Sequence, residues 1–431
     1  MEIAKRVLGN MGVLGQWSKH AHGYFMFPKL EGDLGPQMTF RGKNVLNWSI
    51  NNYYGMASNP EIKEKDIEYA TKYGFSTPMG SRLMTGQTVL HEELESKISE
   101  FVKMEDAFVL NSFYQGMIST IDSLCTNNDA VVYSMDVHSS IKDGIRLHSN
   151  RRFIYTQHNI YNIEEQVKKA CAVAEENGGG VLFVTEGVIG VTGEFSPLDK
   201  IVELKEKYNF LLLVEDAHGF CTIGPNRIGV ADFYNVQDKI DLMVGTFGKA
   251  MGITGGFVAG NEDLINYLRY NMRSQTFSEA LPSAITASAI FRLDYIKEHP
   301  ELQTQLWTIT KALQTGLREA GLEIGKTESM ITPVYMNMEN IQEAIMMMMD
   351  LRETYGIFCV NIVYPYIDEG KIMIRLIPTA MHTLDDVNYT IDALKKITEN
   401  AQAGKYKSNE SLELNANTNK EEEDGEDGNE E

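Results

Sequence analysis

Residues 210–220 read FLLLVEDAHGF, and residues 241–256 read DLMVGTFGKAMGITGG. In each stretch a short apolar run ends directly in polar residues or glycines. Runs of this kind, too short for most helices and rich in Val, Leu and Phe, are typical of strands buried on both faces of a parallel sheet. The two stretches therefore predict buried strands whose carboxyl ends carry chemically reactive side chains.

Similar apolar runs recur between about residues 60 and 290, where they alternate with amphipathic patterns such as VLHEELESKISEFVKM at 89–104. Strands that alternate with helices indicate a parallel sheet covered by helices, because parallel neighbours need a crossover connection. We therefore predict an α/β fold with a mostly parallel sheet of seven strands. The remaining runs are DAFVLN (106–111), AVVYS (130–134), RFIYT (152–156), VLFVTEG (181–187) and GGFVAG (255–260).

Four regions are predicted along the chain. Residues 1–55 form an N-terminal segment, in which QMTFRGKNVLNWSI indicates two strands around a glycine turn. Residues 56–290 form the large domain, and a long helical stretch covers 283–320. Residues 291–402 form a small α+β domain, with strands in ITPVYMNM, FCVNIVYP and KIMIRLIP around a helix at IQEAIMMMMDLRETYG. Residues 403–431 are dense in Glu, Asp and Asn, which predicts a disordered acidic tail.

The net charge is −21 at neutral pH. From Ser408 onward, ten acidic residues and Lys420 contribute −9 of this charge, so the folded body carries about −12. A body of this sign repels phosphate backbones, which argues against general binding of nucleic acid.

Cys125, Cys171, Cys221 and Cys359 show neither a CxxC pattern nor the spacing of metal ligands. We expect reduced thiols in a cytoplasmic protein and no metal site. The N-terminal sequence lacks the apolar core of a signal peptide, and no stretch is apolar enough to span a bilayer. The expected location is therefore cytoplasmic, with peripheral contact at the inner membrane as an open alternative.

Asp216 and His218 follow the first apolar run, and Thr246 and Lys249 follow the second. Ligands of open α/β sheets bind outside the carboxyl ends of strands, so these side chains predict one pocket. Lys249 is suited to form an imine with an aldehyde, and Asp216 to pair with a protonated pyridine nitrogen. Thr246 and nearby N–H groups suit a phosphate. A solvated turn explains either motif alone, but the two together favour pyridoxal 5'-phosphate as the cofactor.

Seven ordered segments match a known pattern, and together they resemble the α-oxoamine synthase family of pyridoxal-phosphate enzymes over about residues 45–398. The resemblance implies a fold-type I transferase, and the bacterial serine palmitoyltransferases are the most similar members. The segments are NNYYG (51–55), GSRLMTGQTVLHEELE (80–95), NSFYQGM (111–117), DVHSSIKDG (136–144), VEDAHGF (214–220), GTFGKA (245–250) and MIRLIPTAMHT (373–383).

The resemblance also implies roles around the cofactor. His138 would stack on the ring and assist proton transfer, and His218 would bond to the phenolic oxygen. Ser112, Phe113 and Tyr114 would lie at the phosphate, near the N-terminus of the helix that follows. A capping or core histidine is the alternative interpretation of His138.

For the substrate, the resemblance implies that Arg375 clamps the amino-acid carboxylate with help from Asn52. Phe277 and Ser278 match a segment that reaches the phosphate of the neighbouring subunit. The expected assembly is therefore a homodimer with shared active sites. Catalysis is assigned to Lys249 together with the histidines and Asp216.

Two departures from the family pattern stand out. Gly248 replaces the serine that usually precedes the lysine, which removes one phosphate hydroxyl and leaves more of that task to Thr246 and Ser278. The family segment S-M-D/E-G-D reads Gly190 to Glu194 here as GVTGE. We expect this loop to affect specificity more than chemistry.

The activity implied is a decarboxylative Claisen condensation of a small amino acid, with serine favoured, and a long-chain acyl-coenzyme A. The products are a 3-keto aminoketone of the sphingolipid type, coenzyme A and carbon dioxide. Cysteate, as in sulfonolipid synthesis, glycine and alanine are alternative substrates. An aminotransferase or lyase of the same fold and a non-catalytic partner subunit are more distant alternatives.

Overall fold

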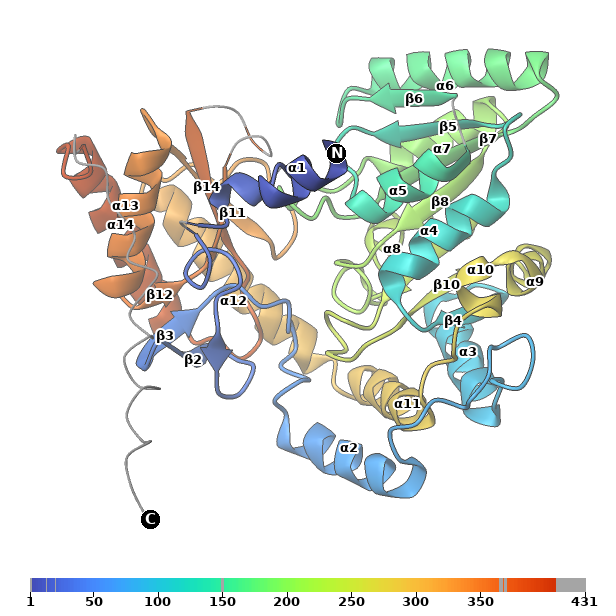
Figure 1. The fold of residues 1–431 in the computed structure, drawn as a ribbon, viewed down its shortest axis with the longest axis horizontal. Helices are drawn as coiled ribbons and strands as arrows, with labels where there is room; N and C mark the ends of the chain where they lie inside the picture. Colours follow the sequence, from blue (N-terminus) through green and yellow to red (C-terminus); the bar gives the residue numbers. More distant parts are fainter. Residues whose placement is uncertain are drawn as a thin grey trace.

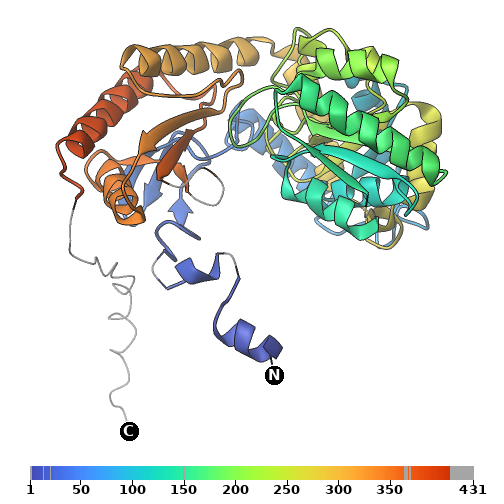
Figure 2. The same ribbon diagram turned by 90° about the horizontal axis from the view of Figure 1, so that it is seen from above.

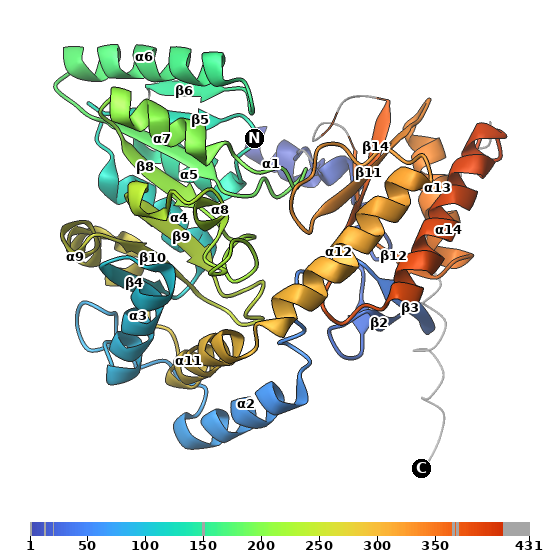
Figure 3. The ribbon, with the colours of Figure 1, turned by 180° about the vertical axis from the view of Figure 1, so that it is seen from behind.

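The computed structural model describes residues 2–12, 14–19, 21–148, 151–363, 367 and 370–407. A large domain and a small domain lie side by side, and the N-terminal segment joins the small one (Figure 1). Seen from behind, helix α12 (Glu301–Glu319) leads from the large domain into the small one (Figure 3).

The core of the large domain is a seven-stranded sheet with the order β4-β10-β9-β8-β7-β5-β6. Only β10 runs antiparallel to its neighbours, so the predicted mostly parallel sheet is confirmed, and each of its strands lies on a predicted apolar run. The strands are β4 (Asp106–Leu110), β5 (Ala130–Ser134), β6 (Arg152–Tyr155), β7 (Val181–Glu186), β8 (Leu211–Glu215), β9 (Leu242–Thr246) and β10 (Gly256–Gly260).

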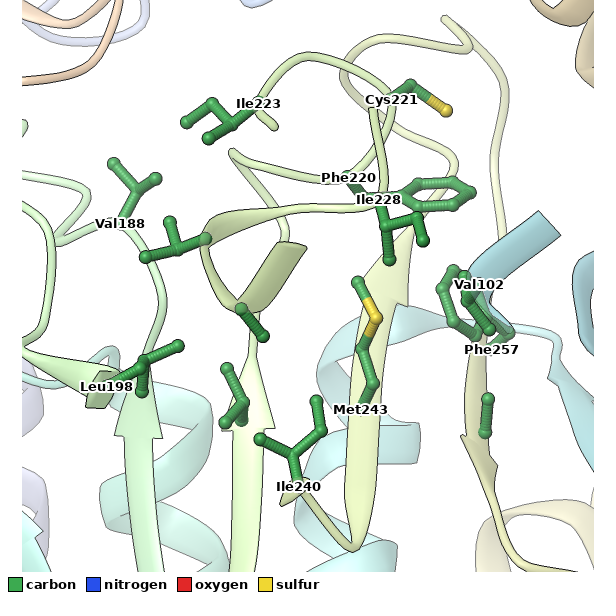
Figure 4. Close-up of a cluster of buried hydrophobic side chains, with 14 of the residues drawn as sticks. Val102, Val188, Leu198, Phe220, Cys221, Ile223, Ile228, Ile240, Met243 and Phe257 are labelled. Carbon is green, nitrogen blue, oxygen red and sulfur yellow. The ribbon is translucent and has the colours of Figure 1, made fainter. Parts of the chain in front are cut away.

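Helices cover both faces of this sheet, which is why its strands are apolar at successive positions. Residues of α3, α6 and α7 pack on one face together with Phe183 and Val214, whereas α4, α5 and α9 pack on the other with Leu182 and Leu213. Figure 4 shows part of the first cluster, in which the rings of Phe220 and Phe257 lie 4.8 Å apart. The helices are α2 (Pro60–Tyr73), α3 (Val89–Val102), α4 (Phe113–Leu124), α5 (Ser139–His148), α6 (Ile160–Glu176), α7 (Leu198–Lys207), α8 (Val230–Phe233), α9 (Glu262–Asn271), α10 (Arg273–Thr276) and α11 (Ser283–Glu298).

The small domain contains an antiparallel sheet of order β11-β14-β13, covered by α12, α13 (Ile341–Glu353) and α14 (Leu384–Gln402). The predicted single strand FCVNIVYP is split at Cys359. Its first part belongs to β12, which pairs in parallel with β3 of the N-terminal segment, and its second part forms β13 beside β14. The strands are β1 (Leu30–Glu31), β2 (Gln37–Phe40), β3 (Lys43–Asn47), β11 (Thr332–Asn337), β12 (Ile357–Phe358), β13 (Val360–Ile362) and β14 (Lys371–Leu376).

Two predicted boundaries can be compared with the packing. Residue 290 lies inside α11, which packs on α2 and α3 of the large domain, and the packing partners change only after this helix. The predicted tail begins at 403, but Tyr406 is buried against the small domain and donates a hydrogen bond to Asp350 (2.6 Å). Residues 408–431 of the predicted tail lie outside the described residues.

Short helices complete the N-terminal segment and the large domain: α1 (Glu2–Leu8) and the 3-10 turns η1 (Gly15–Trp17) and η2 (Gln237–Lys239). In the described ranges, none of the helices is both long and apolar enough to cross a bilayer. Nor do His, Cys, Asp and Glu side chains gather there into a group that suits a metal ion.

A buried ion pair ties α3 to the edge strand β4. The Arg82 guanidinium lies 2.7 Å from Glu95, with both side chains about 5% exposed or less, and it donates to the carbonyl of Val109 (3.1 Å). We expect Arg82→Ala to lower the free energy of unfolding by about 3–5 kcal/mol, because it removes the nearer cation of the buried Glu95 carboxylate and leaves only Arg269, at 3.7 Å. Lys65→Ala, which breaks an exposed pair with Glu68, should cost less than about 1 kcal/mol.

Urea titration followed by circular dichroism measures both losses. Equal losses in the two variants would contradict a structural role for the buried pair.

Candidate active site

Polar side chains gather where the parallel strands β7, β8 and β9 end. Glu186 is the last residue of β7 and is the register partner of Glu215, the last residue of β8. Asp216 follows directly, and β9 ends at Thr246, three residues before Lys249. Because the carboxyl ends of parallel strands meet at one edge of the sheet, these groups share one site.

Asp216 is buried and held by the backbone. Its side chain is 1% exposed, and its two oxygens accept hydrogen bonds from the N–H groups of Gly219 (3.1 Å) and Val230 (2.6 Å). Burial raises the pKa of Asp216 to about 7, although both hydrogen bonds act in the opposite direction. A positively charged partner would therefore be needed to keep this carboxylate ionised at neutral pH.

Lys249 lies in the turn that follows β9. Burial lowers the pKa of its amine to about 8, while the nearby carboxylates of Glu215 and Glu186 raise it and Arg375 lowers it further. A substantial fraction of the amine is therefore uncharged near neutral pH, the form in which it acts as a nucleophile or base. Thr246 shapes the same turn, since its hydroxyl oxygen accepts a hydrogen bond from the N–H of Gly248 (3.1 Å).

His218 is positioned by a tyrosine of the N-terminal segment. The hydroxyl of Tyr53 lies 2.6 Å from Nδ1 of His218, and both side chains are buried. Burial and the charges of Lys249 and Arg375 hold the pKa of His218 well below its usual range, so the ring is neutral. Because Tyr53 occupies Nδ1, any hydrogen bond from His218 to a ligand falls to Nε2.

His138 lies at the exposed side of the site. Its Nδ1 is 2.8 Å from the hydroxyl of Ser140, and its ring is edge-on to that of Tyr114 at 5.9 Å. Desolvation and the charge of Lys249 lower the pKa of His138. The backbone N–H of His138 donates to Glu186, which fixes the start of α5 relative to the end of β7.

The residues around Lys249 that sequence analysis missed are Tyr53, Glu186 and Glu215. Glu186 and Glu215 are each about 3% exposed, and burial together with their mutual repulsion raises the pKa of Glu186, while burial raises that of Glu215. Two buried carboxylates this close hold a proton between them more easily than two negative charges. The signal was present in the sequence, because VTEG and VED each place a glutamate at the end of an apolar run.

Arg375 is available for an anion. It lies on β14 of the small domain, and burial lowers its pKa. In the part of the chain that the structure describes, its Nε is buried without a hydrogen-bond partner and no carboxylate forms an ion pair with it. An unpaired guanidinium among the groups that act on Lys249 and His218 is suited to a substrate carboxylate.

Asn52 is already used within the chain. Its amide nitrogen donates to the carbonyl of Leu34 (2.9 Å), and its amide oxygen accepts from the N–H of Ala57 (3.2 Å). These bonds shape the loop that approaches the turn after Lys249, where a Cβ on Gly252 would lie 3.0 Å from the nitrogen of Ala57. A direct contact between Asn52 and substrate stays a prediction, whereas Asn51 has a buried amide oxygen without a partner in the described residues.

The expected phosphate end is the first turn of α4. Ser112 precedes this helix without capping it through its side chain, so its side chain does not occupy the first N–H groups of the helix, which include those of Phe113 and Tyr114. The hydroxyl of Ser278 is only 2.9 Å from the amide of Asn111 in the same chain. Phe277 is 83% exposed, and its predicted contact with a neighbouring subunit stays a prediction.

These residues fit the cofactor that the resemblance implies. Gly187, Gly219 and Gly229 surround the Asp216 carboxyl so closely that a Cβ on any of them would approach it to within 2.1–2.4 Å, so the position of this carboxyl requires glycines around it. The site contains an acid for the pyridine nitrogen, a lysine amine for the aldehyde, a neutral histidine for the phenolic oxygen and a helix N-terminus for the phosphate.

Comparison with known proteins finds relatives that match most of the chain. The family model for aminotransferase class I and II matches residues 43–394. A cysteate-C-fatty acyltransferase of Capnocytophaga ochracea is 47% identical over 406 residues, covering 94% of this chain and 96% of that protein. An 8-amino-7-oxononanoate synthase of Petrotoga mobilis is 36% identical over 368 residues, covering 85% and 92%.

Solved structures share the fold. Serine palmitoyltransferase of Sphingomonas wittichii superposes with a TM-score of 0.83 at 24% identity, covering 94% of this chain and 98% of that one. Serine palmitoyltransferase has also been solved with pyridoxal phosphate, in a chain 25% identical to this one with a TM-score of 0.81, covering 94% of this chain and 98% of that one.

The pKa of Lys249 can be tested through cofactor loading. Since the neutral amine attacks the aldehyde, the rate of covalent attachment should rise with pH through a midpoint near 8 and level off above it. Stopped-flow absorbance of cofactor-free protein mixed with pyridoxal phosphate measures this rate. In Glu215→Gln the midpoint should move to lower pH, because the charge of Glu215 raises the pKa of Lys249; a midpoint near 10.5 in both proteins would contradict the burial of the amine.

Gly248 can be tested by restoring the missing hydroxyl. A Cβ at this position would lie 3.4 Å from the Thr246 hydroxyl and 4.0 Å from the carbonyl oxygen of Ile253, both ordinary contacts, so the site has room for a serine. We expect Gly248→Ser to bind the cofactor about tenfold more tightly, the effect of one hydrogen bond to a charged group worth about 1.5 kcal/mol. Equilibrium dialysis measures the affinity. Gly248→Ala is the matched control and should show no gain, and an equal gain would mean that chain stiffness is responsible.

Proposed function

Because the chain belongs to the aminotransferase class I and II family, and within it to the α-oxoamine synthases, we propose that it condenses cysteate with a fatty acyl thioester. The chain is a pyridoxal-phosphate-dependent acyltransferase of this family. The observation that carries the choice of substrate is the 47% identity to a cysteate-C-fatty acyltransferase over 94% of the chain. Sequence analysis favoured serine, and this similarity moves cysteate ahead of it.

The site supports the binding of a doubly anionic amino acid. Arg375 is available for one anion, and Lys249 and the neutral His138 and His218 line the same space. Cysteate carries a carboxylate and a sulfonate, so it benefits from a site with few ionised carboxylates. Asp216, Glu186 and Glu215, at the carboxyl ends of β7 and β8, form the floor of the site. Their raised pKa values lower the negative charge of this floor.

Different residues of the chain would carry out different steps of the reaction. Bound pyridoxal phosphate withdraws electrons from the α-carbon of the amino acid. Lys249 would take the α-proton on Nζ, and Asp216 would pair with the ring nitrogen of the cofactor, whose positive charge would keep the Asp216 carboxylate ionised. Arg375 holds the carboxylate so that the α-carbon bond to be broken has one orientation. The α-carbon then attacks the thioester carbonyl and the thiolate of coenzyme A leaves. Loss of the carboxylate as carbon dioxide and return of a proton to the α-carbon give the aminoketone.

A homodimer is part of this proposal. Large apolar side chains are exposed on the loop before α3, on the first residue of α3 and on the segment after α10. A hydrogen bond from Thr77 to Glu279 joins the loop to this segment. Exposed apolar patches of this kind mark protein interfaces. A homodimer would cover them and bring Phe277 to the second site. The exposed residues are Phe75, Met79, Leu83, Met84, Val89 and Phe277.

An absorbance titration of the holoenzyme tests the proposal. Cysteate should change the visible spectrum at lower concentration than serine, glycine or alanine, and fatty acyl-coenzyme A should then release free thiol. A response to serine with thiol release would restore the sphingolipid-type reaction. Formation of a keto acid without thioester would instead identify an aminotransferase.

Arg375 gives the matched test of substrate binding. Arg375→Lys keeps the charge but loses the two parallel N–H donors, and should raise the KM for cysteate about tenfold or more. Lys249→Ala should abolish turnover. An unchanged KM in Arg375→Lys would mean that another residue binds the carboxylate.

A further inference from the structure

A large apolar cavity lies between the N-terminal segment and the small domain. Its volume is about 580 Å³, within the range of roughly 300–1,000 Å³ of ligand pockets. Trp17, Phe25 and Met26 line it from the N-terminal segment, and Ile345 and Met348 line it from α13. In Figure 2 the N-terminal segment runs below the strands and helix α13 of the small domain. Protein cores are close-packed, so a cavity of this size has the character of a binding site.

Two residues that line the cavity are neighbours of active-site residues. Val191 lines it and directly follows Gly190. The N–H of Gly190 donates to Glu186 (3.0 Å), and a Cβ on Gly190 would lie 3.1 Å from Nε2 of His218. Val360 lines it and is the register partner of Arg375 on β14. A ligand held near Arg375 and His218 therefore has this cavity beside it.

Among the described residues that line the cavity, Arg352 is the charged one, and aromatic rings enclose its charge. The Arg352 guanidinium lies 4.1–5.4 Å from the centres of four aromatic rings and donates to the carbonyl of Tyr24 (2.6 Å). The rest of the lining is almost wholly Leu, Ile, Val, Met, Phe, Trp, Pro, Ala and Cys.

We propose that this cavity binds the hydrocarbon chain of the acyl thioester, with Val191 and Val360 at the end next to the reacting carbonyl. The assignment rests on the proposed function, since it takes the fatty acyl group as the second substrate. It gives the N-terminal segment the task of covering the chain. The acyl length that the enzyme prefers is then set by α13 and the N-terminal segment.

Filling the cavity tests this assignment in the holoenzyme. In the unaltered protein, kcat/KM should rise about fourfold for each methylene of the acyl-coenzyme A until the cavity is full, the factor that corresponds to about 0.8 kcal/mol. Ile345→Trp should lower kcat/KM for palmitoyl-coenzyme A at least tenfold and leave butyryl-coenzyme A within about twofold. The spectral response to cysteate should not change.

The matched control is Met346→Trp, because Met346 is partly buried on the same helix but does not line the cavity. It should keep the preference for long chains. A loss of this preference in both variants, or in neither, would overturn the assignment.

A second measurement does not depend on turnover. Trp17 lines the cavity, so a stearoyl-coenzyme A brominated in the middle of its chain should quench tryptophan fluorescence, and Trp17→Phe should remove most of this quenching. Quenching that is the same in Trp17→Phe would overturn the assignment. Quenching through Trp17 without thiol release would support the cavity and count against the proposed condensation, so the two failures are distinguishable.

Discussion

The burial of the Lys249 amine beside carboxylates at one edge of the sheet is the constraint on which the site depends. A charged amine is costly to bury, and the site reduces this cost by lowering the pKa of Lys249. The floor adapts in the same way, because Asp216, Glu186 and Glu215 have raised pKa values and carry less negative charge than their number implies. The site can therefore accept a cationic ring nitrogen, which would balance the charge of Asp216, and an anionic substrate, which would balance the charge of Arg375.

The N-terminal segment connects this floor to the small domain. Trp48 stacks on His382 with ring centres 3.8 Å apart and donates to Thr390 (3.0 Å), while Tyr53, five residues later, bonds to His218. Strand β3 of the N-terminal segment also pairs in parallel with β12 of the small domain. Arg375 in the small domain and Lys249 in the large one are therefore held in one site by a segment that contributes to both. Motion between the domains would therefore change substrate binding and the position of His218 at the same time.

The same segment gives the apolar cavity its outer wall. Because the strand is broken at Cys359, β12 pairs with β3 and β13 pairs with β14. Val360 therefore lies beside Arg375, whereas Phe358 packs on Phe40 of the N-terminal segment. The glycine-bearing loop at Gly190–Glu194, which departs from the family pattern, meets the cavity at Val191. This departure from the family pattern thus lies where the amino acid and the acyl chain would meet.

The amino-acid sequence by itself determined the seven strands of the large sheet, their mostly parallel arrangement and the positions of Asp216, His218 and Lys249 at strand ends. These features follow from local apolar runs and from the rule that parallel strands end at one edge. Only the tertiary structure decided that Tyr53 holds His218, that Glu186 and Glu215 are paired, that Asn52 is bonded within its own loop and that Arg375 has an unpaired Nε. It also decided the cavity. Each of these depends on contacts between segments far apart in the chain, and the pKa shifts depend on burial, which a local pattern does not contain.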